Sequence, residues 1–220
     1  MNPAVSFSMF LLGRLTLFKC ALYALAQTIG AFLASFMVFL VYLNHINEYQ
    51  ERNYAHNDKR FDPNRNTNFS NNIGYYSMEL APIFATYPKD SIGKWSTFSN
   101  FFDQLFSTSL FIVAILAVTE KRNAQIPHQL VSILIGFSLV AVGTSFGLRG
   151  FAVNPARDLG PRLFTLIAGW GVEPFISHGY YFWIPVVAPM FGSVFGTILY
   201  SLLVSNCIED NATERPFKTF

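Results

Sequence analysis

Residues 150–162 read "GFAVNPARDLGPR" and residues 1–5 read "MNPAV", so the triplet Asn-Pro-Ala occurs twice in the chain. Asn is a preferred N-cap residue, and Pro suits the first position of a helix. Each triplet therefore predicts a helix start at which the Asn side-chain oxygen caps the helix. The two predicted helices are short and cover residues 3–12 and about 155–167. At about 1.5 Å per residue, each crosses only about half of a bilayer's hydrocarbon core.

The composition indicates a membrane protein. Of the 220 residues, 52% are hydrophobic and only 13% are charged, whereas soluble domains carry about 25% charged residues. The formal net charge of +2 is too small to indicate nucleic-acid binding. Two cysteines and four histidines show no metal-ligand spacing, and the chain has no paired nucleophile and base and no phosphate loop. We therefore expect no enzymatic activity, no cofactor and no metal.

Four segments are long and apolar enough to cross a bilayer: residues 18–43, 101–118, 130–146 and 180–204. Lys121 and Arg122 lie between the second and third of these, and the positive-inside rule places that connection in the cytoplasm. The loop 44–100 is then extracellular and the tail 207–220 cytoplasmic. Asn68 begins a sequon in the loop and is a predicted glycosylation site, whereas the sequon at Asn211 should stay unmodified.

Small residues spaced four apart occur in two of the predicted spans. They are Gly30 with Ala34 and Gly192 with Gly196. Such pairs let helix backbones approach closely in lipid. They predict close packing within one bundle, with contacts between subunits as the alternative.

Two half-length helices that begin inside a membrane need partners for their first N–H groups, from protein or from a water-filled cavity. If their N-termini face each other, two positive dipole ends meet at one point of a pore and oppose cations and protons. The two Asn side chains can then donate N–H groups to a passing oxygen. One triplet alone is ordinarily a helix cap, but two copies at half-length segments indicate a pore. The predicted pore midpoint consists of Asn2, Pro3, Ala4, Asn154, Pro155 and Ala156.

The order of the segments indicates an internal repeat. The second unit reads span, span, half-helix, span, whereas the first reads only half-helix, span. Inverted repeats surround a midplane site in many membrane transporters. The repeat predicts two further spans before Asn2. We therefore expect Met1 to be an internal methionine and the 220-residue sequence alone to form an incomplete pore.

With these features the chain resembles the aquaporins, and in particular their glycerol-conducting branch, the aquaglyceroporins. The segment "GFAVNPARDLGPRLFTLIAGWG" (150–171) carries most of the resemblance, and "NPAVSF", "FATYP" and "FFDQLF" support it. The resemblance implies an all-α, aquaporin-like bundle within residues 1–206, with two re-entrant half-helices and four of the usual six spans. It also implies a homotetramer in a lipid bilayer, expected to be the plasma membrane.

The resemblance further implies a selectivity filter near the outer end of the pore. Arg157 follows the second triplet, and its guanidinium can donate to solute hydroxyls while it repels cations. Phe151 matches an aromatic wall of glycerol channels, and Gly143 matches the position of a histidine in water-selective members. The match requires a one-residue gap within 147–150.

Three more residues match the glycerol branch: Asp158, Arg162 and Pro185. Asp158 and Arg162 are four residues apart, a spacing that predicts an ion pair on one helix face. We interpret all three as residues that support the filter without contacting the solute.

The predicted function is a passive channel for glycerol, water and other small uncharged solutes, selected by pore size and hydrogen bonding. Two alternatives remain open at this point. One is a water-selective aquaporin, and the other is a truncated, non-conducting subunit that regulates full-length channels.

Overall fold

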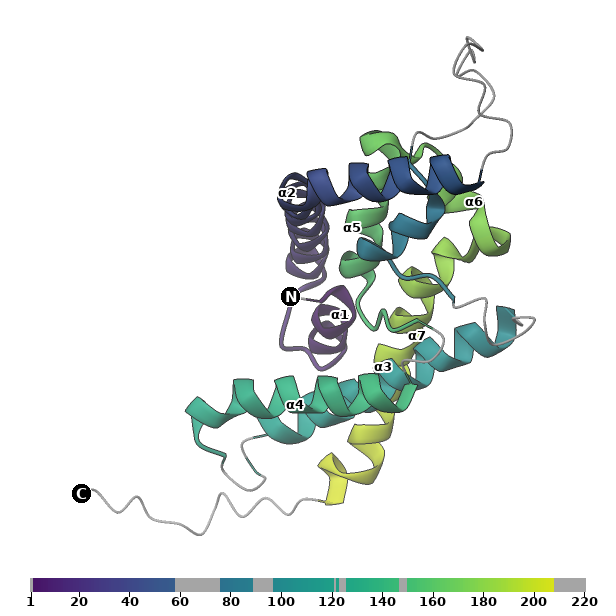
Figure 1. The fold of residues 1–220 in the computed structure, drawn as a ribbon. Coiled ribbons are helices and arrows are strands. Elements are labelled where there is room, and N and C mark those ends of the chain that lie inside the picture. The colour runs from purple at the N-terminus through teal and green to yellow at the C-terminus, as the bar shows by residue number, and fades with distance from the viewer. Residues whose placement is uncertain are drawn as a thin grey trace.

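The computed structural model describes residues 2–57, 76–88, 97–120, 122, 126–146 and 150–207, without the side chains of 53–57 and 207. Within these ranges the chain forms helices and no strand. Four helical stretches are long and apolar enough to cross a membrane: Leu17–Arg52, Thr97–Thr119, His128–Phe146 and Glu173–Leu203. The fold is thus an all-α membrane bundle (Figure 1). The predicted glycosylation site Asn68, the sequon at Asn211 and the end of the tail lie outside the described residues.

Helix α1 (Pro3–Leu11) is the first half-length helix. Gly13 follows it with φ of 70°, a left-handed conformation that suits glycine and turns the chain away from the helix axis. The buried face of α1 carries small polar residues. On this face the Ser8 Oγ lies 2.7 Å from Thr197 Oγ1 of the last long helix, a hydrogen bond that ties the two helices together.

Helix α2 (Leu17–Asn57) is 41 residues long and continues well beyond the predicted span 18–43. The first part of the predicted loop 44–100 is therefore helical. Ile46 is buried there, and the Gln50 side-chain oxygen accepts a hydrogen bond from the Ser77 N–H at 3.0 Å. These contacts attach the end of α2 to the short 3₁₀ helix η2 (Met78–Ile83). Packing onto η2 thus extends a helix whose polar sequence predicted a loop.

Helices α3 (Thr97–Thr119), α4 (His128–Phe146) and α7 (Ile184–Leu203) contain the remaining spans. The close contact is between α3 and α7. A Cβ placed on Gly192 would lie 2.5 Å from the Leu105 carbonyl oxygen, and one on Gly196 would lie 2.6 Å from the Ser109 carbonyl oxygen. The Gly192–Gly196 pair therefore packs within this chain.

The second half-length helix is α5 (Pro155–Thr165), which continues into the π-helical turn η5 (Leu166–Trp170). Helix α6 (Glu173–Tyr180) and the 3₁₀ turn η6 (Tyr181–Trp183) then lead into α7, and η7 (Ser205–Cys207) follows α7. Helix α5 packs closely against α2. A Cβ on Gly160 would lie 2.6 Å from the Thr28 carbonyl oxygen, so the absence of a side chain permits this approach.

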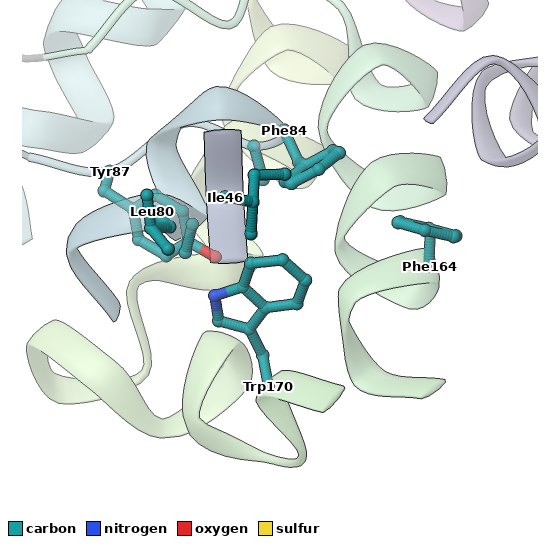
Figure 2. Packing of buried hydrophobic residues seen from close by; sticks show 8 residues of the cluster. Ile46, Leu80, Phe84, Tyr87, Phe164 and Trp170 are labelled. Carbon is teal, nitrogen blue, oxygen red and sulfur yellow. The ribbon is translucent and has the colours of Figure 1, made fainter. Parts of the chain in front are cut away.

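The main hydrophobic cluster lies where α2, η2, α5 and η5 meet (Figure 2). Trp170 is fully buried at its centre, and its indole N–H donates to the Ser77 carbonyl oxygen at 2.9 Å. The Trp170 and Phe84 ring centroids are 5.4 Å apart, and those of Phe84 and Phe164 are 5.6 Å apart. This Trp170 cluster consists of Ile46, Leu80, Ala81, Phe84, Ala85, Tyr87, Phe164 and Trp170. It fixes η2, and the segment that follows it, over the end of α5.

Other helix faces are apolar and exposed. Of the nineteen residues of α4, all of them described, only Val142 is buried. Helix α2 exposes Leu25, Leu33, Met37 and other large apolar side chains. Contiguous exposed apolar surface of this kind is suited to lipid or to further membrane helices.

Candidate functional site

The first triplet forms a capped helix start. Asn2 has φ of –158°, outside the helical region, and its side-chain oxygen accepts the Ala4 N–H at 2.9 Å. Pro3 occupies the first helical turn, and both Pro3 and Ala4 are buried. This confirms the cap that the Asn-Pro-Ala sequence predicted.

The second triplet repeats this arrangement. The Asn154 side-chain oxygen accepts the N–H groups of Ala156 and Arg157 at 3.2 and 3.3 Å. Pro155 again lies in the first turn, and Pro155 and Ala156 are buried. The two half-length helices therefore begin with the same cap, as predicted.

The two helix starts lie next to each other. The Asn2 side-chain N–H donates to the Val153 carbonyl oxygen at 2.9 Å, across 151 positions of sequence. Val153 immediately precedes the second cap. The positive ends of two helix dipoles are thus brought to one place, where they favour acceptor oxygens and disfavour cations.

A buried glutamine holds the loop that carries the second triplet. The Gln104 side-chain oxygen accepts the N–H groups of Ala152 and Val153 at 3.1 and 3.2 Å, and its N–H donates to the Gly150 carbonyl oxygen. Val153 has φ of 55°, which is rare for a β-branched residue. Such strain persists where the surroundings fix the backbone. Gln104 supplies that restraint, a role that was not predicted from the sequence.

Arg157, in the first turn of α5, is exposed, but its guanidinium is held in place. It donates to Thr86 Oγ1 at 3.1 Å and to the Phe84 carbonyl oxygen at 3.4 Å. Both partners lie in the segment fixed by the Trp170 cluster. An Arg offers five N–H donors, so two such bonds leave others for a solute.

Gly143 and Phe151 contact each other. A Cβ placed on Gly143 would lie 3.0 Å from the Phe151 ring, so the ring occupies the space that a side chain would take. Among the described residues, no hydrogen bond joins this pair to Arg157. Phe151 and Arg157 are connected instead through the loop that Gln104 holds.

Asp158 and Arg162 form the predicted ion pair. The Arg162 Nε lies 2.8 Å from Asp158 Oδ1, and both side chains are fully buried. The pair also grips the Thr86 backbone, because Asp158 accepts the Thr86 N–H at 2.7 Å and Arg162 donates to the Thr86 carbonyl oxygen at 2.6 Å. Since Thr86 binds Arg157, the ion pair supports Arg157 through one intermediate residue.

The Arg162 guanidinium also covers the Tyr87 ring, with its central carbon 4.4 Å from the ring centroid. Burial raises the pKa of the Tyr87 hydroxyl to about 12, while the Arg162 charge opposes this rise. Tyr87 is therefore neutral at physiological pH, and the charge of Arg162 is balanced by Asp158. Pro185, the third residue predicted to support the filter, is buried in the first turn of α7.

A groove of about 490 Å³ runs between α2 and the start of α5. The Asn154 and Arg157 side chains lie on one wall, and Gly30 and Ala34 of α2 lie on the other. Polar donors thus face a largely apolar wall, an arrangement that suits a small molecule with both hydroxyl and carbon surfaces. Within the described ranges, no group of three or more His, Cys, Asp or Glu residues could hold a metal ion.

Comparison with known proteins identifies the family. The model of the family described as major intrinsic protein matches residues 1–200. Aquaporin-10 of Homo sapiens is 37% identical over 206 residues, which are 93% of this chain and 62% of that protein. Aquaporin-9 of Mus musculus is 38% identical over 204 residues, 92% of this chain and 62% of that protein. The chain spans less than two thirds of the length of these two relatives.

A solved structure confirms the predicted fold. The X-ray structure of the aquaglyceroporin from Plasmodium falciparum superposes with a TM-score of 0.74 at 28% identity. The match covers 94% of this chain and 73% of that one. The resemblance to the aquaporins implied an aquaporin-like bundle, and this similarity bears the expectation out.

Proposed function

The chain belongs to the major intrinsic protein family, and from this we propose that it is a passive membrane channel for glycerol, water and other small uncharged solutes. The observation that carries the proposal is the meeting of two capped helix starts, at which Asn2 donates to the Val153 carbonyl oxygen. Arg157 lies in the first turn of α5, beside one of these starts. Its donors and the two dipole ends favour hydroxyl oxygens and oppose cations and protons.

We propose that the solute path passes Asn154 and Arg157, which line the groove between α2 and α5. Asn2 and Asn154 would then mark the midpoint of the pore, and Arg157, Phe151 and Gly143 the selectivity filter. The contact between Gly143 and Phe151 supports this assignment, because the missing side chain leaves room for a ring that can contact the carbon backbone of glycerol. Asp158, Arg162 and Pro185 would support the filter from behind, in the bilayer of the plasma membrane and within a homotetramer.

Replacing Gly143 with His tests the proposal. The new side chain would push against Phe151, since even a Cβ would lie 3.0 Å from its ring. We expect glycerol permeability of proteoliposomes to fall about tenfold or more, a barrier increase of about 1.4 kcal/mol, while water permeability is retained. Gly136→His is the matched control, because Gly136 lies on the same helix and faces open space. Unchanged glycerol flux in Gly143→His would count against a selectivity filter built from Gly143 and Phe151.

A second function, a non-conducting subunit that regulates complete channels, is favoured by the exposed apolar faces of α2 and α4. Val142 is the single buried residue of α4, so most of this helix is available to other membrane helices. Co-expression with a full-length relative tests this function. A change in the relative's flux, with no flux from this chain alone, would support the regulatory subunit over the channel.

A further inference from the structure

A second cavity, of about 260 Å³, lies between the start of α3, the segment after η2 and the junction of α6 with α7. It shares no lining residue with the groove between α2 and α5. Its lining residues are Pro88, Thr97, Asn100, His178, Gly179, Tyr181 and Ile184. None of them takes part in the channel mechanism proposed above.

Two polar side chains in this lining are buried, and each carries an oxygen without a hydrogen-bond partner among the described residues. Asn100 is 4% exposed and Tyr181 is 2% exposed. Within the described part of the chain, neither the Asn100 side-chain oxygen nor the Tyr181 hydroxyl has a hydrogen-bond partner. The hydroxyls of Tyr87 and Ser177, each adjacent in sequence to a lining residue, are also buried without partners. Buried polar groups in folded proteins are almost always paired with protein, water or a ligand, so the cavity indicates an occupant.

The charges around the cavity disfavour an anionic occupant. The described lining residues include no Lys, Arg, Asp or Glu. The nearby Arg162, which covers the Tyr87 ring, is already paired with Asp158 at 2.8 Å. A buried anion would therefore find no Lys or Arg among the described lining residues to balance its charge, which is strongly unfavourable.

The lining also has apolar parts. Pro88 and Ile184 contribute carbon surface, and the ring of Tyr181 adds more. A water molecule takes up about 30 Å³ in the liquid, so the cavity has room for a larger molecule. We propose that this cavity binds a small neutral polyhydroxy compound, with hydroxyls on Asn100 Oδ1 and the Tyr181 hydroxyl and its carbon chain against Pro88 and Ile184.

The backbone beside the cavity is held in a strained conformation. His178, Gly179 and Tyr180 have φ of 53°, 66° and 63°, three left-handed residues in succession. Two of them are not glycine, and strain of this kind is concentrated at ligand clamps and active sites. The turn brings His178 and Gly179 to the cavity and carries the chain into the buried Tyr181.

The test is thermal unfolding of the purified protein in lipid nanodiscs across a glycerol series. Glycerol stabilises proteins non-specifically in proportion to its concentration, whereas a ligand bound at a site adds a rise that follows the logarithm of concentration above the dissociation constant. We expect the wild type to show an additional logarithmic rise of about 3 °C at ten times the dissociation constant of this cavity, and we expect this additional rise to be missing from Tyr181→Phe and Asn100→Leu. Tyr180→Phe is the matched control, because Tyr180 is 60% exposed and removes the same atom one residue away.

Glycerol in the pore would contribute equally to all four proteins, so the difference between Tyr181→Phe and Tyr180→Phe reports this cavity alone. Tyr181→Phe removes one oxygen and is expected to fold even if Asn100→Leu does not. A glycerol-dependent rise in Tyr181→Phe equal to the rises in the wild type and Tyr180→Phe would overturn the proposal. Permeability measurements test the channel separately, and their result does not alter this comparison.

Discussion

Arg157 is positioned by residues distant from it in sequence. Its guanidinium binds Thr86, and the Thr86 backbone is held on both sides by the Asp158–Arg162 pair. The pair is fully buried, so its charges are not screened by solvent. The position of the proposed filter arginine therefore depends on an ion pair that faces away from the groove.

Asp158→Asn should destabilise the protein strongly. The substitution keeps the side-chain volume but leaves the buried Arg162 charge uncompensated, a change that costs about 3–5 kcal/mol. Thermal unfolding in detergent measures the loss. Glu48→Gln is the matched control, because Glu48 and Arg52 form an i, i+4 pair at the surface and such pairs contribute about 0–1 kcal/mol. Equal losses in the two variants would show that burial does not strengthen the Asp158–Arg162 pair.

Glu120 gives the stability a pH dependence. Its hydrogen bond from Arg122 lowers the pKa of the carboxyl below the ordinary 4.5. The carboxylate therefore stabilises the fold fully above pH 4.5, and this contribution is lost as the pH falls through the lower folded-state pKa. Glu120→Gln should unfold at a lower temperature than the wild type at neutral pH, and this difference in unfolding temperature should disappear in acid. Ser205→Ala is the control, because it removes an uncharged partner of Arg122. The difference in unfolding temperature between this variant and the wild type should not change with pH. If the difference between Glu120→Gln and the wild type persisted in acid, the ionised Glu120 carboxylate would not be the source of the stabilisation.

At the scale of the elements, α3 and α7 depend on glycine at their contact. A Cβ at Gly192 would lie 2.5 Å from the Leu105 carbonyl oxygen and 2.8 Å from Thr108 Cβ. Gly192→Ala should therefore cost about 1–3 kcal/mol through overpacking. Gly30→Ala, on the open side of α2, should instead stabilise its helix by about 0.5–1 kcal/mol. The unfolding temperatures of both variants test this prediction. An unchanged unfolding temperature in Gly192→Ala would mean that α3 and α7 are further apart in the membrane.

The elements that could be predicted from sequence are those with local signals. The starts of α1 and α5 follow from Asn-Pro, and the spans follow from uninterrupted apolar length. The continuation of α2 to Asn57 could not be predicted, because residues 44–57 are polar and the helix there depends on contacts of Ile46 and Gln50 with η2. Long-range packing, which single-sequence patterns do not report, determined this boundary.

The same limit applies to the candidate site. The Asp158–Arg162 pair was predictable because i, i+4 spacing is visible in the sequence. Gln104 was not, because its partners lie 46 to 49 positions away and nothing in an apolar run marks one polar residue as an anchor. Asp158 and Arg162 contact each other across four positions of sequence, and this short spacing is visible as a pattern. The contacts of Gln104 span many more positions and leave no such pattern.

At the scale of the whole molecule, the two half-length helices enter from opposite ends of the bundle (Figure 1). The chain after α1 leads to Arg14, which lies 3.9 Å from Glu120 at the end of α3. The chain after α5 leads instead to Trp170, packed against Ile46 and Leu80 at the other end of α2. The N-termini of α1 and α5 meet between these two ends, where the Asn2 side chain donates to the Val153 carbonyl oxygen. An inverted repeat would produce this arrangement.

The orientation of the bundle follows from the charges at its two ends and can be tested by glycosylation. Arg14 and Arg122 lie at the Glu120 end, and basic residues favour the cytoplasmic side. The Trp170 end should then be extracellular, together with the loop that contains Asn68, while Asn211 in the tail should be cytoplasmic. Expressed in a eukaryotic cell, the protein should lose mass on treatment with an N-glycosidase, and Asn68→Gln should abolish that loss. Asn211→Gln is the matched control and should leave it unchanged. A glycan on Asn211 would reverse the orientation, because glycans are added only on the luminal side, and it would place Arg157 near the cytoplasmic mouth of the pore.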